Sequence, residues 1–130
     1  MILLDTHIWV RWLAKDAAPL PEKLVSLIEE AEEVGVSAVS CWEVAYLHKR
    51  NRIELPVPLA KWIAASLEGS NVKCKPLTHE IAIKAALLPE IHRDPIDRFI
   101  IAAAIIEEAQ LISLDERFPE YTELKPFLIQ

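Results

Sequence analysis

The chain has 130 residues, a hydrophobic content of 52% and a formal net charge of −6 at pH 7. This length is typical of one domain and allows a sizeable core, so we expect residues 1–130 to form a single domain. The negative charge disfavours a broad basic surface of the kind that attracts nucleic acid through Lys and Arg. The apolar opening at residues 1–4 is too short for a signal peptide or a membrane span, which predicts a soluble, cytoplasmic protein with no membrane partner.

Short apolar runs alternate with helical patterns along the whole chain. The predicted strands are 2–4, 34–39, 72–77 and 111–114, with an additional edge strand at 125–129. The predicted helices are 7–14, 21–33, 41–50, 58–68, 79–87 and 95–109. Strands that alternate with helices of this length predict right-handed crossovers and a sheet covered by helices on both faces. The expected fold class is α/β, a three-layer α/β/α architecture with a central, mostly parallel sheet of four or five strands.

Four acidic residues stand at the starts of predicted helices, close behind apolar runs. They are Asp5, Glu43, Asp97 and Asp115. Open parallel sheets bind ligands beyond the carboxyl ends of their strands, where the strand order reverses, so these side chains can meet at one edge. Carboxylates brought together repel one another unless a proton or a cation intervenes, and hard oxygen ligands select Mg²⁺ or Mn²⁺. The pattern therefore predicts a site for one of these ions.

Each acid also has an alternative explanation as a helix cap. Ser40 and Glu43 match a capping box, in which the Glu43 carboxylate would accept a hydrogen bond from the Ser40 amide. Asp94, followed by Pro95, matches an N-cap before a first-position proline, Asp5 or Thr6 could cap the first helix, and Asp115 could cap the short turn at 116–118. Capping and ligation are compatible, because a helix N-terminus keeps a nearby carboxylate ionised and ready to bind a cation.

The distribution of aspartates favours a site over capping alone. The chain has only five Asp, and four of them stand at these junctions: Asp5, Asp94, Asp97 and Asp115. Asp has one fewer rotatable bond than Glu, so it loses less side-chain entropy when it holds an ion.

Four segments carry a family resemblance: Leu3-Leu4-Asp5-Thr6-His7, Ser40-Cys41-Trp42-Glu43-Val44, His92-Arg93-Asp94-Pro95-Ile96-Asp97-Arg98 and Leu111-Ile112-Ser113-Leu114-Asp115. With these segments the chain resembles a PIN domain from residue 2 to about residue 121, and more narrowly the VapC-type toxins of type II toxin–antitoxin pairs. The third segment is the most distinctive of the four.

The resemblance implies a ribonuclease that depends on Mg²⁺ or Mn²⁺ and hydrolyses phosphodiester bonds with metal-activated water, leaving a 5′-phosphate and a 3′-hydroxyl. The acids implied to be catalytic and to hold the metal are Asp5, Glu43, Asp97 and Asp115. Asp97 rather than Asp94 matches the family's third acid, because of its distance from the alanine stretch at 102–104. The implied partners are an RNA substrate, a second copy of the chain in a homodimer, and a small antitoxin, part of which lies over the active site.

Several roles stay open for other polar residues near the four acids. Asp94, Thr6 and Ser113 are candidates for groups just outside the metal ligands, although Asp94 is equally a helix cap and Ser113 a small strand residue that bonds local backbone. Arg98 could contact a substrate phosphate, orient a ligand or pair with an acid. His7 and His92 could suggest metal ligation or RNA cleavage by paired imidazoles, but no spacing makes them partners, so the sequence assigns them no role.

Two other classes of function stay open at this point. An aspartyl-phosphate receiver domain also has an acidic pocket at its strand ends, but it needs a further acid beside the first one and a strand-end Lys, whereas Thr6 and His7 follow Asp5 here. A non-catalytic binding module with a PIN-like fold is the other alternative, and the presence of all four acids argues against it.

Overall fold

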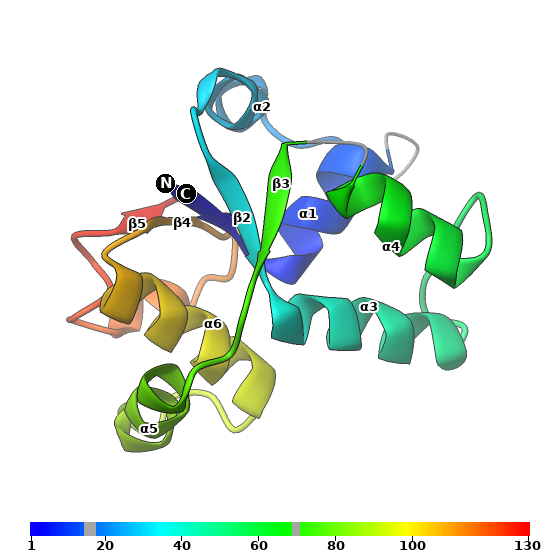
Figure 1. Cartoon of the computed structure of the whole chain (residues 1–130). Coiled ribbons are helices and arrows are strands. Elements are labelled where there is room, and N and C mark those ends of the chain that lie inside the picture. The colour runs from blue at the N-terminus through cyan, green and yellow to red at the C-terminus, as the bar shows by residue number, and fades with distance from the viewer. Residues whose placement is uncertain (15–17, 69–70) are drawn as a thin grey trace.

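The computed structural model describes residues 1–14, 18–68 and 71–130, and Figure 1 shows how the elements are arranged. The strands are β1 (Ile2–Leu4), β2 (Val34–Ser37), β3 (Val72–Lys75), β4 (Gln110–Ile112) and β5 (Leu128–Ile129). The α-helices are α1 (Thr6–Leu13), α2 (Glu22–Glu30), α3 (Ala38–Lys49), α4 (Leu59–Leu67), α5 (His79–Leu87) and α6 (Pro95–Glu107), and a short 3₁₀ helix, η1, covers Phe118–Glu120. The predicted order of strands and helices is confirmed.

All five strands are parallel and form one sheet in the order β3-β2-β1-β4-β5. The chain starts in the centre, moves outward through β2 and β3, and then crosses to the other side for β4 and β5. The order therefore reverses between β1 and β4, the point at which open α/β sheets bind ligands. Asp5 follows β1 directly, whereas Asp115 lies three residues beyond the end of β4.

Helices cover both faces of the sheet, which confirms the three-layer architecture. Leu3 and Leu111 pack into a core beneath α5 and α6, whereas Leu4 and Ile112 pack into a second core with residues of α1, α2 and α4. Figure 1 shows α5 and α6 on one side of β2 and β3, with α1 and α4 on the other. Because both faces are buried at the centre of the sheet, β1 consists of apolar residues alone, whereas the edge strand β3 includes two lysines.

The start of α3 differs from the predicted boundary. The sequence predicted a strand that continues to Val39, but the helix begins at Ala38, and the Ser37 hydroxyl accepts a hydrogen bond from the Val39 amide at 3.2 Å. Ser40 lies inside the helix, so the predicted capping box of Ser40 and Glu43 is wrong. An apolar run does not reveal where a buried strand gives way to the first turn of a buried helix, because both bury the same residue types.

Two predicted N-caps are confirmed. The Asp5 carboxylate accepts a hydrogen bond from the Thr6 amide at 2.8 Å, and the Asp94 carboxylate accepts one from the Ile96 amide at 2.9 Å, with Pro95 at the first position of α6. These caps fix the starts of α1 and α6, the two helices that begin nearest the predicted site.

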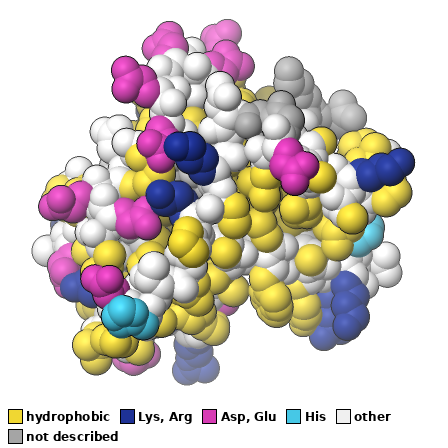
Figure 2. Space-filling view, in the orientation of Figure 1, with side chains coloured by type: hydrophobic (Ala, Val, Ile, Leu, Met, Phe, Trp, Pro, Cys, Tyr) yellow, Lys and Arg dark blue, Asp and Glu magenta, His cyan; other side chains and the backbone are white. Residues whose placement is uncertain are grey.

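The face shown in Figure 2 has no single charge character: acidic side chains gather over α2, apolar ones over α3 and α4, and the Lys and Arg side chains are scattered. Large exposed apolar residues include Trp42 on α3 and Leu87 at the end of α5, which are 56% and 78% exposed. In the parts of the chain that the structure describes, no helix has the length and hydropathy needed to cross a membrane.

Candidate metal centre

Asp5 is buried at the end of β1 and is held by three hydrogen bonds. The Thr6 amide donates to Oδ1 at 2.8 Å, and the Ser113 hydroxyl donates to Oδ2 at 2.7 Å. Oδ2 also lies 3.2 Å from Nδ1 of His7, whose Nε2 accepts a hydrogen bond from the Leu114 amide at 3.2 Å. A neutral His7 therefore carries its proton on Nδ1 and donates it to Asp5. A carboxylate has about four acceptor positions, so Asp5 keeps room for one further ligand bond.

Ser113 connects the ends of the two central strands. Its hydroxyl donates to Asp5, and the same oxygen accepts a hydrogen bond from the Asp115 amide at 3.1 Å. Ser113 is fully buried. The predicted bond to local backbone is confirmed, and the bond to Asp5 adds a cross-strand role that the sequence did not reveal.

Glu43 approaches the same region from α3. Burial raises the pKa of Glu43, a hydrogen bond with Thr6 opposes that rise, and the charges of Asp5 and Asp94 add to it. The Thr6 hydroxyl also lies 2.9 Å from the Ser40 hydroxyl, so Thr6 joins the start of α1 to α3. Thr6 thus holds Glu43 in reach of Asp5.

Asp97 lies in the first turn of α6, and the charges of the other three predicted acids act on its carboxyl group. Burial, followed by the charges of Asp5, Asp94, Glu43 and Asp115, raises the pKa of Asp97 to about 7. A carboxyl group with so high a pKa lies where burial and nearby negative charge both disfavour its ionised form. This is the environment that a bound cation would stabilise.

Two overlapping groups of residues define the candidate site. A cavity of about 310 Å³ is lined by Asp5, Thr6, His7, Val10, Arg11, Glu43, Leu47, Ile53 and Asp97. Beside it, one side-chain ligand atom each of His92, Asp97 and Asp115 lie within 4.8 Å of one another. Asp97 belongs to both groups, so all four predicted acids converge on it. The excess of carboxylate oxygens fits Mg²⁺ or Mn²⁺, hard ions that prefer such ligands.

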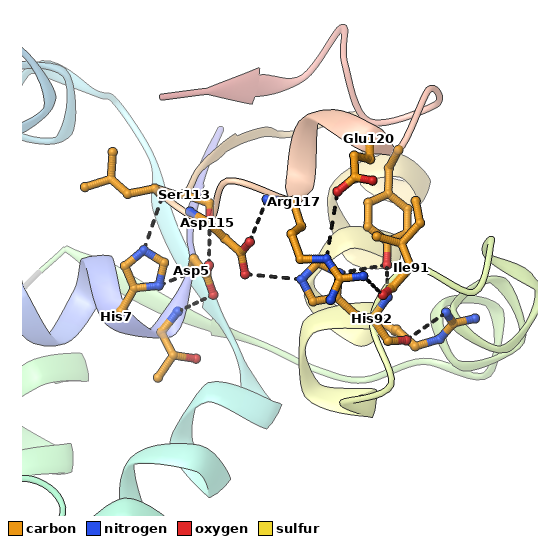
Figure 3. Close-up of polar contacts among 12 residues, drawn as sticks. Asp5, His7, Ile91, His92, Ser113, Asp115, Arg117 and Glu120 are labelled. Atoms are coloured by element: carbon orange, nitrogen blue, oxygen red, sulfur yellow. Dashed lines mark hydrogen bonds and ion pairs between the residues drawn. The ribbon is translucent and has the colours of Figure 1, made fainter.

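His92 is the functional candidate that the sequence missed. It is buried, and its Nε2 lies 3.2 Å from Oδ2 of Asp115. Figure 3 shows Asp115 between the Asp5 group on one side and His92 on the other. The hydrogen-bond and ring partners of the His92 side chain lie more than 20 positions downstream. No short-range periodicity in the sequence carries that information.

Arg98 bonds backbone carbonyls, and within the described residues it forms no ion pair with an acid. The buried guanidinium donates hydrogen bonds to the backbone carbonyls of Ala86, Leu88, Pro89 and His92 at 2.8 to 3.3 Å. It therefore fastens the segment between α5 and α6 and satisfies carbonyls that the end of α5 leaves without helical partners. Asp94 is exposed and caps α6, and its place just outside the metal ligands stays a prediction.

The sequence profile of the PIN domain family matches residues 2–124 of the chain. The chain is also 31% identical over 129 residues to Ribonuclease VapC22 of Mycobacterium tuberculosis (strain ATCC 25618 / H37Rv), an alignment that covers 98% of this chain and 97% of that protein.

Several solved structures have a similar fold. VapBC2 from Rickettsia felis, bound to a DNA fragment from its promoter, matches with a TM-score of 0.70 at 18% identity, over 99% of this chain and 98% of that one. A toxin–antitoxin complex from Klebsiella pneumoniae matches with a TM-score of 0.66 at 18% identity, over 100% and 97%. FitAcB from Neisseria gonorrhoeae matches with a TM-score of 0.62 at 19% identity, over 100% and 97%. At this level of identity the likeness establishes the fold.

Proposed function

This chain belongs to the PIN domain family, and from that premise we propose that it is an endoribonuclease that depends on Mg²⁺ or Mn²⁺ and acts as the toxin of a toxin–antitoxin pair. The observation that carries the proposal is the convergence of the other acids on the half-buried Asp97 carboxyl group, because burial and their charges together raise its pKa to about 7. Membership of this family excludes the receiver-domain alternative. We further propose that residues 1–130 form one PIN domain, since every strand joins one sheet.

The residues that would hold the ion are Asp5, Glu43, Asp97 and Asp115. When bound, a divalent ion supplies Lewis-acid stabilisation of charge on the phosphoryl group and lowers the pKa of water. Asp5 is fixed for this task by its hydrogen bonds from Ser113 and the Thr6 amide. A hydrolysis of this type requires no side-chain nucleophile. The product that we expect from it carries a 5′-phosphate.

Electrostatics make the cation necessary for substrate binding as well. RNA is a polyanion, the chain carries a net charge of −6, and the cavity is lined by carboxylates. Without a cation these charges repel RNA, and a bound cation offsets part of the negative charge at the point where a phosphate would bind.

The direct test is cleavage of a fluorescently labelled RNA by the purified protein in Mg²⁺, in Mn²⁺ and in EDTA. We expect cleavage only with the ions, and a loss of at least 100-fold in Asp5→Asn and Asp97→Asn, because each substitution removes a ligand charge without changing side-chain size. Glu80→Gln, an exposed acid in the first turn of α5, is the matched control. Cleavage that persists in EDTA would reject the mechanism, and no cleavage under any condition would favour the non-catalytic module.

The ends of the products give a second criterion. Hydrolysis leaves a 5′-phosphate, whereas cleavage by paired imidazoles leaves a 2′,3′-cyclic phosphate. His7 and His92 contact different aspartates, which does not suit such a pair. Labelling of the new 5′ ends with and without phosphatase therefore separates the two chemistries.

The proposed partners are a small antitoxin and a second copy of the chain. Because the proposed substrate is RNA, we also propose that the protein is cytoplasmic. Two cavities, of about 310 and 470 Å³, share Arg11 in their linings, and we propose that an antitoxin segment binds there. The exposed apolar side chains of Trp42, Ile83 and Leu87 support self-association. Growth arrest on expression, relieved by co-expression of a small neighbouring gene, tests the toxin role, and light scattering after gel filtration tests the dimer.

A further inference from the structure

His92 lies between a phenol and a carboxylate in a continuous chain of hydrogen bonds. Its Nδ1 is 2.9 Å from the Tyr121 hydroxyl, and its Nε2 is 3.2 Å from Oδ2 of Asp115. The His92 amide also donates to the Tyr121 hydroxyl at 3.0 Å. His92 and Tyr121 are 7% and 1% exposed, so water does not compete freely for these bonds.

The acceptors along this chain determine where the protons lie. An ionised Asp115 has only acceptor oxygens, so the bond to it requires a proton on Nε2 of His92. In a neutral ring Nδ1 is then an acceptor, and the Tyr121 hydroxyl donates to it while accepting from the His92 amide. Burial raises the pKa of Tyr121, which keeps the proton on this phenol. All three groups are satisfied by a neutral His92 in the Nε2–H tautomer.

Packing fixes the ring as well as its protons. The His92 ring stacks on Tyr121 with centroids 5.6 Å apart and meets the Phe118 ring edge-on at 5.3 Å. Arg98 donates to the His92 carbonyl at 3.3 Å and so holds its backbone. The imidazole therefore has one orientation, which directs Nε2 at Asp115.

We propose that His92 and Tyr121 are positioning residues that hold the Asp115 carboxylate in the orientation needed to bind the catalytic cation. This inference rests on the proposed metal-dependent function. The Asp115 carboxylate is held at both oxygens, because Oδ1 accepts a hydrogen bond from the Arg117 amide at 2.8 Å while Oδ2 faces His92. A ligand fixed in this way loses less entropy when the ion binds, and such outer partners typically contribute 10- to 100-fold to metal affinity.

The geometry favours positioning over direct ligation by His92, although Nε2 lies close to oxygens of Asp97 and Asp115. As a ligand, Nε2 would have to lose its proton, and a neutral ring would then carry the proton on Nδ1. That proton would point at the Tyr121 oxygen, which already accepts from the His92 amide. Ligation would thus remove the bond to Asp115 and reverse the bond between Nδ1 and the Tyr121 hydroxyl.

The first experiment measures Mg²⁺ and Mn²⁺ affinity by titration calorimetry for the full chain. We expect His92→Ala to weaken binding by about tenfold or more, and Tyr121→Phe to weaken it in the same direction by a smaller factor. His92→Gln is the rescue variant, because its amide nitrogen can donate to Asp115 in place of Nε2. Tyr46→Phe, which removes a hydroxyl that accepts hydrogen bonds from Arg50 at the end of α3, is the matched control.

The second experiment reads the tautomer itself by ¹⁵N NMR of the imidazole in the unaltered protein. We expect the Nε2–H form without the ion and with Mg²⁺, and a mixture of tautomers in Tyr121→Phe. This measurement keeps the inference falsifiable should His92→Ala fail to fold.

The outcomes separate this inference from the proposed function. If the unaltered protein binds neither ion, the proposed function fails. If it binds the ions but His92→Ala and Tyr121→Phe bind them equally well, the function stands and the positioning role is wrong. Loss of the Nε2 proton when Mg²⁺ is added would show that His92 is a ligand and would also overturn the inference.

Discussion

Asp97 lies half-buried among other carboxylates, and burial together with their charges raises its pKa from 3.8 to about 7. A raised carboxyl pKa means that the folded state holds the proton more tightly than the unfolded state. The contribution of this group to stability is therefore complete below about pH 4 and is lost as the pH rises through 7. The metal-free protein thus carries its largest electrostatic cost at the pH where it would have to work.

Asp97→Asn should accordingly stabilise the metal-free protein, and do so more at pH 8 than at pH 5. The expected gain in unfolding free energy at pH 8 is on the order of 1 to 2 kcal/mol, since solvent screens part of the repulsion. Urea denaturation in EDTA at both pH values measures it. The same variant should fail to gain stability from Mg²⁺, which would separate a ligand from a merely repelled carboxylate.

An equal gain at pH 5 and pH 8 would contradict the raised pKa. Glu80→Gln is the control here as well, because it removes one negative charge from an exposed helix position and tests whether net charge alone explains the effect.

Arg98 is a buried cation whose partners are backbone carbonyls and not an acid. Its substitution tests how much these hydrogen bonds stabilise the fold. Its guanidinium fork donates to four carbonyls between residues 86 and 92. Arg98→Lys keeps the charge but cannot reach all four, so we expect a loss of about 2 kcal/mol or more in unfolding free energy. Urea denaturation measures the loss, and Arg93→Lys, at an exposed neighbouring position, should change little. A fully stable Arg98→Lys would mean that charge rather than geometry matters at this site.

At the scale of elements, the start of α6 combines a cap with a candidate ligand. Asp94→Ala removes the hydrogen bond to the Ile96 amide and should cost about 1 kcal/mol, whereas Asp94→Asn caps almost equally well and should cost a few tenths at most. Denaturation of the two variants measures the cap. RNA cleavage by Asp94→Asn then tests the charge alone, and retention of activity within a few-fold would identify Asp94 as a cap outside the ligand set.

The order of the elements was predictable because apolar runs and turn residues carry it locally. The caps at Asp5 and Asp94 were predictable for the same reason, since each depends on its own helix start. The boundary between β2 and α3 was not, because Val39 is buried in either conformation. The difference matters for the site, since α3 carries Glu43.

The four acids could be named from the sequence, but their supports could not. Ser113 bonds a residue 108 positions away, and His92 contacts Tyr121 29 positions downstream. Arg98 bonds backbone carbonyls, which every residue carries and which therefore leave no mark in the sequence. The acids proposed to hold the ion stand near helix starts, which follow local rules, whereas the side chains that orient them depend on the tertiary fold.

At the scale of the whole molecule, the fold brings acids from β1, α3, α6 and the segment after β4 to one place in a chain of net charge −6. This arrangement is costly without a cation, so the stability of the entire domain should depend on the ion. An ion present at 100 times its dissociation constant adds about 2.7 kcal/mol to the free energy of unfolding, which corresponds to a rise of about 10 °C in Tm for a domain of this size.

We therefore expect Mg²⁺ to raise Tm, and to raise it more at pH 8 than at pH 6, because the ion must displace the proton that Asp97 holds below its pKa of about 7. Thermal denaturation followed by circular dichroism measures the shift. KCl at matched ionic strength is the control, since K⁺ screens repulsion without occupying a site for a small dication. If KCl raised Tm as much as Mg²⁺, or if Asp5→Asn kept the full Mg²⁺ effect, the acids would form a repulsive patch and not a metal centre.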